Sequence, residues 1–171
     1  MRAIVRGVSN SYEKALASFF GNGPTDLEEA KAQHSAYVSK LRELGLIVRE
    51  LDSHPDYPDC CFVEDHAIVA GDSALITNAG HDSRLGEKEA VIEALEGDLK
   101  LEYMASGGRM DGGDVLQFGN KFLVGHSSRT NRQGIQNLKD FVEFRGFDLH
   151  VIEVPKQSLH LISICTSPMP G

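Results

Sequence analysis

Polar and apolar residues alternate along this chain with two periods, one typical of helices and one typical of strands. Apolar residues spaced three and four positions apart predict helices over 27–44, 84–96 and about 131–145. Short apolar runs predict strands at 2–8, 46–51, 61–70, 73–79, 99–104, 112–118, 121–125 and 149–154. Because helices and strands follow one another along the chain, the pattern predicts an α/β protein.

Turn and cap residues set the boundaries of several of these elements. Gly71-Asp72 and Gly119-Asn120 each separate two strand runs by two residues, which is the spacing of a β-hairpin. Thr25 and Glu28 have the spacing of a capping box at the start of the first helix, and Gly45 can end that helix.

One supersecondary unit recurs along the chain. The stretches EDHAIVAGDSALIT (64–77) and GGDVLQFGNKFLVG (112–125) match in residue type about 48 positions apart, and a helix and a strand follow each of them. A period of this size indicates stacked or radial copies of a strand-strand-helix-strand unit. A third copy begins at 158–163 and the sequence stops at Gly171, so the array is expected to be incomplete.

Composition and charge narrow the classes of function. With 171 residues, 41% of them apolar and 25% charged, the chain is expected to form a single globular domain over 1–171. A net charge of −8 without a basic run argues against a nucleic-acid partner and suits a small cationic ligand. No apolar segment is long enough for a membrane span or a signal peptide, and three cysteines make no disulfide framework. A cytoplasmic protein without a membrane partner is therefore expected.

Three carboxylates interrupt an otherwise apolar stretch, PDCCFVEDHAIV (58–69). Glu64 and Asp65 lie within a predicted strand and Asp59 precedes it, and a buried carboxylate there needs a positive partner. A guanidinium ligand would supply that partner, since it pairs with carboxylates through parallel hydrogen bonds. The pattern equally allows a solvated strand edge or a structural salt bridge.

Two arginines and one histidine are further candidates. Arg84 and Arg129 occupy matching places in two repeats, each before a helix, where an arginine can hold a substrate carboxylate. His160 lies in an apolar, strand-like stretch and is either a core residue or a general acid/base oriented by a carboxylate such as Asp111.

The glycine and cysteine patterns are less specific. Asp111-Gly112-Gly113-Asp114 forms either a simple turn or a place where the backbone approaches a ligand closely. The spacing of His54, Cys60, Cys61 and His66 fits no zinc motif, so no metal is expected.

Four stretches together resemble a known enzyme family. PDCCFVEDHAIV, ALITNAGHDSRLGE, MDGGDVLQFGNKFLVGHSSRTNRQG and LHLIS lie in order over nearly the whole chain. They resemble dimethylarginine dimethylaminohydrolase, of the guanidino-group-modifying (amidinotransferase) superfamily. The resemblance implies a five-bladed α/β propeller, or pentein, of strand-strand-helix-strand units around a central site. About 48 residues per unit gives roughly 240 for five, so the chain is expected to supply about three of the five units.

The resemblance also implies a role for each candidate residue. Asp59, Glu64 and Asp65 match the residues that hold the guanidinium, Arg84 and Arg129 those that hold the α-carboxylate, and Leu16 the backbone contact of the substrate lid. His160 matches the residue that transfers a proton, and Asp111 the carboxylate that orients it.

The chemistry implied is covalent and needs neither cofactor nor metal. In the family a cysteine attacks the guanidinium carbon, dimethylamine leaves, and water resolves the adduct to citrulline. That cysteine lies near the C-terminus of full-length members, and none of Cys60, Cys61 and Cys165 matches it. The chain is therefore expected to be truncated, to lack the C-terminal units with the nucleophile, and to show little turnover.

Three functions remain open. The first is the hydrolysis of dimethylarginine to citrulline and dimethylamine. The second is a non-catalytic short form that binds arginine analogues or a protein partner. The third is an arginine deiminase-like activity, for which paired Arg84 and Arg129 favour a substrate with a free carboxylate. The sequence also leaves a homo-oligomer open.

Overall fold

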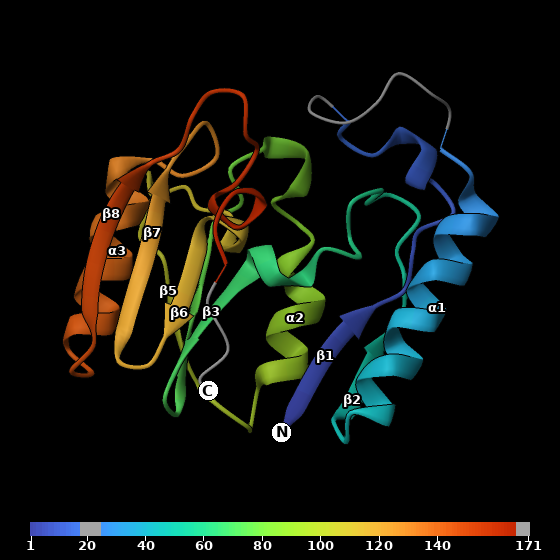
Figure 1. Ribbon diagram of the computed structural model, residues 1–171, viewed down its shortest axis with the longest axis horizontal. Coiled ribbons are helices and arrows are strands. Elements are labelled where there is room, and N and C mark those ends of the chain that lie inside the picture. Colours follow the sequence, from blue (N-terminus) through green and yellow to red (C-terminus); the bar gives the residue numbers. More distant parts are fainter. Residues whose placement is uncertain (18–24, 167–171) are drawn as a thin grey trace. The chain divides into compact units, whose positions relative to one another are not determined.

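The structure is a computed structural model that describes residues 1–17 and 25–166 (Figure 1). The chain divides into two compact units, Met1–Val63 and Glu64–Gly171. The single domain expected over 1–171 from the chain's length stays a prediction. Within the described ranges, no helix has the length and apolar character that a membrane crossing requires.

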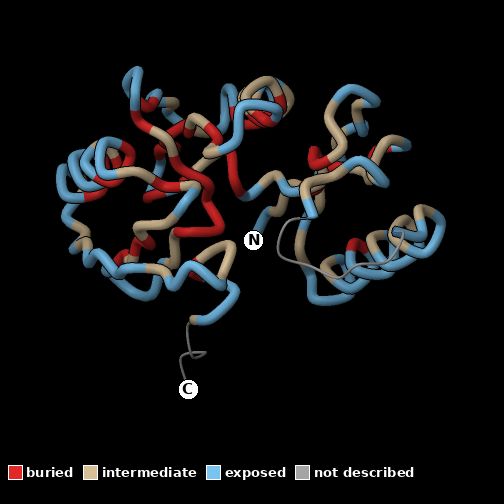
Figure 2. The backbone as a smooth tube through the Cα atoms, turned by 90° about the horizontal axis from the view of Figure 1, so that it is seen from above, coloured by how far each residue is buried: buried red, intermediate tan, exposed pale blue. Residues whose placement is uncertain are grey.

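The first unit is built from two parallel strands and the helix between them. β1 (Arg2–Arg6) pairs with β2 (Ile47–Leu51), and α1 (Leu27–Glu43) connects them. The side chain of Asp26 accepts a hydrogen bond from the backbone N–H of Glu29, so Asp26 caps α1 in place of the expected Thr25. The helix is exposed along most of its length, as Figure 2 shows.

The predicted inner face of α1 is confirmed over most of its length. Val38 is buried and His34 and Leu41 are half-buried, as expected for positions three and four apart. Leu44, the last residue of the helix predicted over 27–44, lies just beyond the end of α1 and is 67% exposed, so the predicted helix was one residue too long.

The second unit contains two copies of the predicted strand-strand-helix-strand repeat. The first copy is β3 (Ala67–Ala70), β4 (Ser73–Ile76), α2 (Lys88–Leu95) and β5 (Lys100–Tyr103). The second copy is β6 (Val115–Phe118), β7 (Lys121–His126), α3 (Arg132–Glu143) and β8 (Asp148–Glu153). Corresponding strands begin 48 positions apart, at 67 and 115, 73 and 121, and 100 and 148.

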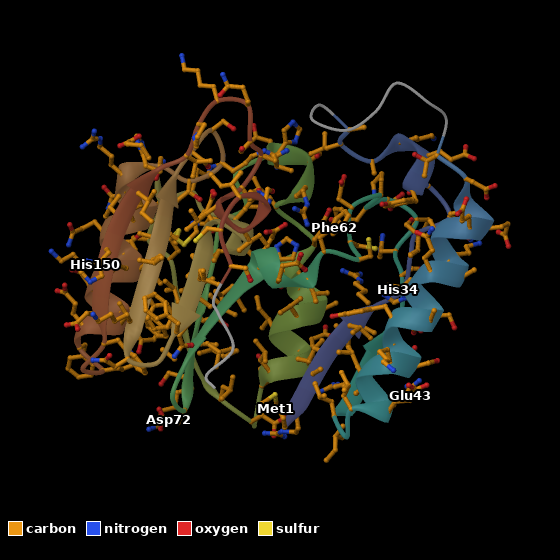
Figure 3. All side chains as sticks on the ribbon, viewed as in Figure 1. Met1, His34, Glu43, Phe62, Asp72 and His150 are labelled. Carbon is orange, nitrogen blue, oxygen red and sulfur yellow. The ribbon has the colours of Figure 1, made fainter. Side chains whose placement is uncertain are left out.

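Each copy forms its own three-stranded sheet. The first two strands make an antiparallel hairpin, and the third strand pairs in parallel with the second. Gly71 and Gly119 have positive φ angles of 64° and 56° in the two hairpin turns, which explains why glycine occupies both positions. Figure 3 shows Asp72 at the tip of the first hairpin and His150 on the outer strand β8.

Apolar side chains of α3 and of the two sheets form the main core of this unit. Leu138, Phe141 and Val142 are buried along one face of α3, against Phe122 and Val124 of β7. The inner face predicted for this helix from its apolar spacing is therefore confirmed. Figure 1 shows α3 lying behind the sheet that contains β7 and β8.

Short 3-10 turns, rather than strands, precede the two copies of the repeat, and a third such turn follows β8. They are η2 (Val63–His66), η4 (Gly112–Asp114) and η5 (Leu161–Ser163). The strand predicted over 61–70 begins only at Ala67, so the expectation that Glu64 and Asp65 lie within a strand was wrong. In this turn the carbonyl of Asp65 accepts from the Thr77 hydroxyl at 2.6 Å, a contact outside any strand ladder.

Candidate functional site

The candidate site lies in the second unit, where the matching turns η2 and η4 meet backbone to backbone. A Cβ atom on Gly112 would lie 1.9 Å from the Glu64 carbonyl oxygen, so only glycine fits there. The N–H of Gly113 donates to Asp65 Oδ1 at 2.8 Å. The glycine pair therefore allows a close approach, as one reading of the sequence suggested, and the approaching groups are the protein's own.

Asp65 is paired with a guanidinium of the same chain. Nη1 of Arg84, in the turn η3 (Asp82–Arg84), lies 2.6 Å from Asp65 Oδ2, with both side chains at most 4% exposed. Nε and Nη2 of Arg84 donate to Glu87 Oε2 at 3.0 and 2.9 Å. Burial disfavours the charged guanidinium, but the two carboxylates outweigh burial and raise the pKa of Arg84. The positive partner that Asp65 requires is thus Arg84.

Glu87 and His66 are two members of this buried network that the sequence reasoning missed. His66 Nε2 lies 2.9 Å from Glu87 Oε2, and both side chains are 1% exposed. One sequence signal was present for Glu87, because an acid three residues after Arg84 can reach it on a helical turn. No pattern in the sequence linked His66 to it.

Asp111 gathers a second set of charged groups. Its carboxylate is fully buried, and Oδ2 accepts from Arg129 Nη1 at 3.1 Å and lies 3.2 Å from His160 Nε2. The N–H of Gly80 donates to Oδ1 at 2.7 Å. Burial would raise the pKa of Asp111, but the hydrogen bonds with His160 and Gly80 and the nearby guanidinium groups lower it. Asp111 is therefore ionised, and the pairing of Asp111 with His160 is the one expected from the sequence.

His160 is held against the glycine pair. It precedes η5, and a Cβ atom on Gly113 would lie 2.5 Å from His160 Nδ1, so the imidazole fills the space that a side chain there would need. Burial lowers the pKa of His160, but the hydrogen bond with Asp111 and the charges of Asp65 and Asp114 outweigh burial and raise it. The ring is therefore well suited to carry and donate a proton near neutral pH.

Glu64 lies beside this cluster and is exposed to solvent. Loss of water around its carboxyl group and the neighbouring charge of Asp65 raise the pKa of Glu64. Because Glu64 stays accessible, it is the carboxylate of the pair with Asp65 that a solute can approach directly.

Two of the predicted residues belong to the first unit. The backbone N–H of Leu16 donates to both oxygens of Asp59, at 3.1 and 3.3 Å, and Asp59 is buried. Glu64, Asp65, Arg84, Asp111, Arg129 and His160 all belong to the second unit. The roles given to these eight residues by resemblance stay predictions.

Two of the three cysteines contact backbone groups. Cys60 is fully buried, with its Sγ atom 3.8 Å from the carbonyl oxygen of Gly7, as in a core position. The backbone N–H of Cys165 donates to the carbonyl of Leu161.

The cluster offers anionic oxygens at close range. Asp65, Asp111 and His160 each present one atom within 4.8 Å of the others. The two carboxylates are already paired with the guanidinium groups of Arg84 and Arg129. These carboxylates therefore match a site that recognises guanidinium groups better than one that coordinates a divalent metal ion through oxygen ligands alone. The expectation of a site without metal or cofactor stays a prediction.

Sequence comparison identifies related proteins. The profile of the family described as N,N dimethylarginine dimethylhydrolase, eukaryotic, matches residues 8–167. The N(G),N(G)-dimethylarginine dimethylaminohydrolase of Streptomyces coelicolor is 35% identical over 168 residues, which cover 97% of this chain and 64% of that protein. The chain spans 58% to 64% of the length of the first curated relatives that it matches.

Structure comparison agrees with the sequence. A Cys→Ser variant of the dimethylarginine dimethylaminohydrolase of Pseudomonas aeruginosa, in complex with citrulline, superimposes with a TM-score of 0.88 at 30% identity. The match covers 94% of this chain and 63% of that one. An amidinotransferase from Microseira wollei, SxtG, has a TM-score of 0.75 at 16% identity, which supports the fold alone. The expected α/β pentein fold is confirmed, and the chain belongs to the dimethylarginine dimethylaminohydrolase family.

Proposed function

We propose that the ligand of this site is dimethylarginine, which the family hydrolyses to citrulline and dimethylamine. The observation that carries the proposal is the pair of the buried Asp111 and the half-buried His160, beside a carboxylate, Asp65, that already binds a guanidinium. Such a site can hold a guanidinium ligand and supply a proton to it. The relative from Pseudomonas aeruginosa was solved with citrulline bound, which supports the same product here.

The proposed roles follow the chemistry of each group. Glu64 and Asp65 hold the guanidinium of the substrate and keep its carbon electrophilic. In the family mechanism a cysteine thiolate, which none of Cys60, Cys61 and Cys165 is matched to supply, would add to that carbon. His160 would then give its proton to the departing amine as the carbon–nitrogen bond breaks. Water then displaces the sulfur and leaves citrulline, while Asp111 orients the imidazole throughout.

The α-carboxylate of the substrate is assigned to Arg129, with Arg84 as a further contact. The side chain of Arg129 is 11% exposed and makes one ion pair, with Asp111. Arg84 is 4% exposed and is engaged by Asp65 and Glu87. Arg129 is therefore the arginine that can turn toward a carboxylate at lower cost, because Arg84 would leave two buried carboxylates behind.

We further propose that the 171-residue chain binds methylated arginine without efficient turnover. The proposal rests on the family motif, because none of Cys60, Cys61 and Cys165 matches the position of the family's nucleophile. An efficient release of citrulline from asymmetric dimethylarginine by the purified chain would contradict it.

Binding is measured by isothermal titration calorimetry with monomethylarginine. Agmatine, which has a guanidinium and no carboxylate, is the matched ligand, and Arg129→Gln is the matched variant. The proposal expects the variant to bind monomethylarginine about tenfold more weakly and agmatine unchanged. If the wild-type chain binds neither ligand, the proposed function is wrong for this chain. If the variant loses both ligands equally, the assignment of the α-carboxylate to Arg129 is wrong.

A further inference from the structure

Asp114, which the proposed mechanism does not use, is a fully buried carboxylate at the end of η4. It accepts hydrogen bonds from Ser127 Oγ at 2.5 Å, from Thr130 Oγ1 at 2.6 Å and from the backbone N–H of Leu161 at 3.0 Å. These donors are neutral, whereas Asp65 and Asp111 each pair with an arginine. A buried ionised carboxylate is costly, so three donors converging on it indicate a specific role.

The direction of each hydrogen bond is determined by the neighbouring groups. Ser127 Oγ accepts from the backbone N–H groups of Arg129 and Thr130, so its own hydrogen points to Asp114. Thr130 Oγ1 accepts from the N–H of Asp111, so its hydrogen points to Asp114 as well. Leu161 can only donate through its N–H. Both oxygens of Asp114 therefore act as acceptors, Oδ2 for the two hydroxyl groups and Oδ1 for the N–H of Leu161.

The three partners belong to segments that carry the proposed site. Leu161 directly follows His160, and its N–H is held by Oδ1. Ser127 and Thr130 flank Arg129, and both are held by Oδ2. One carboxylate thus joins the turn that carries the proton donor to the loop that carries the arginine.

We propose that Asp114 is a positioning residue, whose carboxylate ties the His160 turn to the Arg129 loop and so fixes the proton donor and the carboxylate-binding arginine relative to each other. The roles of His160 as proton donor and of Arg129 as the carboxylate-binding arginine rest on the proposed function. The joining of the two segments can be tested without it.

Asp114 also acts on His160 through its charge. It is one of several anionic groups that face the imidazole and favour its protonated form, the others being Asp65, Asp111 and Glu64. Loss of the Asp114 charge removes part of that stabilisation directly. Loss of its hydrogen bond to Leu161 also frees the imidazole to move away from Asp111, which acts in the same direction.

Asp114→Asn is the sharpest test because the side chains have the same shape. If the new NH₂ group takes the place of Oδ2, the hydroxyl of Ser127 loses its acceptor, because Ser127 Oγ already accepts two backbone N–H groups and must donate. If it takes the place of Oδ1, it faces the N–H of Leu161, which can only donate. Either orientation removes at least one hydrogen bond, so the substitution cannot preserve the network.

The primary measurement is the NMR titration of the His160 imidazole in the 171-residue chain, together with calorimetry of monomethylarginine. In Asp114→Asn the titration midpoint of His160 is expected to move to lower pH, and the dissociation constant to rise about tenfold. Val142→Ala, a buried change in α3, is the matched control for a general loss of stability. It is expected to leave the His160 midpoint in place.

Thr130 supplies a second pair of variants, in case Asp114→Asn does not fold. Thr130→Val removes one donor to Asp114 and keeps the shape, and Thr130→Ser restores the hydroxyl. We expect Thr130→Val to weaken monomethylarginine binding and Thr130→Ser to recover it. The positioning role is overturned if the Asp114→Asn chain folds, binds monomethylarginine as the wild type does and keeps the His160 midpoint unchanged. If the Asp114→Asn chain does not fold, equal binding of monomethylarginine by Thr130→Val and Thr130→Ser overturns the role instead. An absence of binding by the wild-type chain would instead reject the proposed function, and the titration would still decide about Asp114.

Discussion

The buried pairing of Arg84 with Asp65 and Glu87 gives a quantitative test of how the site is held. Arg84→Met keeps much of the side-chain volume and removes the guanidinium. It leaves two carboxylates that are 3% and 1% exposed without the cation that lies 2.6 and 2.9 Å from them. Breaking a buried ion pair from one side costs about 3–5 kcal/mol, because the remaining charge cannot be solvated. A loss of that size is a large share of the roughly 5–15 kcal/mol that stabilises a typical domain.

Arg109→Met is the matched control, because it breaks an ion pair of similar length in a different environment. Arg109 Nη2 lies 2.7 Å from Asp82 Oδ1, but the two side chains are 35% and 83% exposed. Water solvates Asp82 after the change, so the expected loss in the free energy of unfolding is at most about 1 kcal/mol. The two variants therefore separate the effect of burial from the effect of the contact itself.

Urea unfolding followed by circular dichroism at neutral pH measures both losses. We expect Arg84→Met to lose several times more stability than Arg109→Met. The free energy of unfolding of Arg84→Lys should lie between those of Arg84→Met and the wild type. The ammonium keeps the charge but cannot reach both carboxylates with the geometry of a guanidinium. If Arg84→Met costs no more than Arg109→Met, the reasoning that this network is desolvated and held by charge is refuted.

Three further predictions concern the glycines and the histidine. Gly113→Ala would place a methyl group 2.5 Å from His160 Nδ1 and push the ring away from Asp111. NMR should therefore show the His160 titration midpoint at lower pH, and an unchanged midpoint would contradict the packing described. Because the pKa of His160 is raised above its ordinary 6.5, its contribution to stability is present below that pH and is lost as the pH rises through the folded-state pKa. The stability difference between wild type and His160→Gln should thus be larger near about pH 5.5 than near about pH 9. A difference that grows with pH would contradict the raised pKa of His160. Gly119→Ala should cost about 1 kcal/mol in urea unfolding, since φ is 56° there, and should leave ligand binding unchanged.

Local patterns in the sequence were sufficient for the architecture of the repeats. The apolar periods of 3.6 and 2 place the helices and most strands, and Gly71 and Gly119 place the two hairpin turns, since each feature depends on residues close in sequence. The 48-residue period predicted the repeat because identical units need similar residues at the same positions. The pairing of Asp111 with His160 was also expected, although it rested on chemical complementarity and on the family resemblance.

Tertiary structure alone decided what the polar residues do with one another. Glu64 and Asp65 looked like strand residues, whereas in the structure they lie in the turn η2, where Asp65 contacts Thr77 and Gly113. The pairing of Asp65 with Arg84, rather than with a ligand alone, was not visible in the apolar pattern. Hydrogen bonds and ion pairs join residues far apart along the chain, and their partners are selected by packing, which no local period encodes.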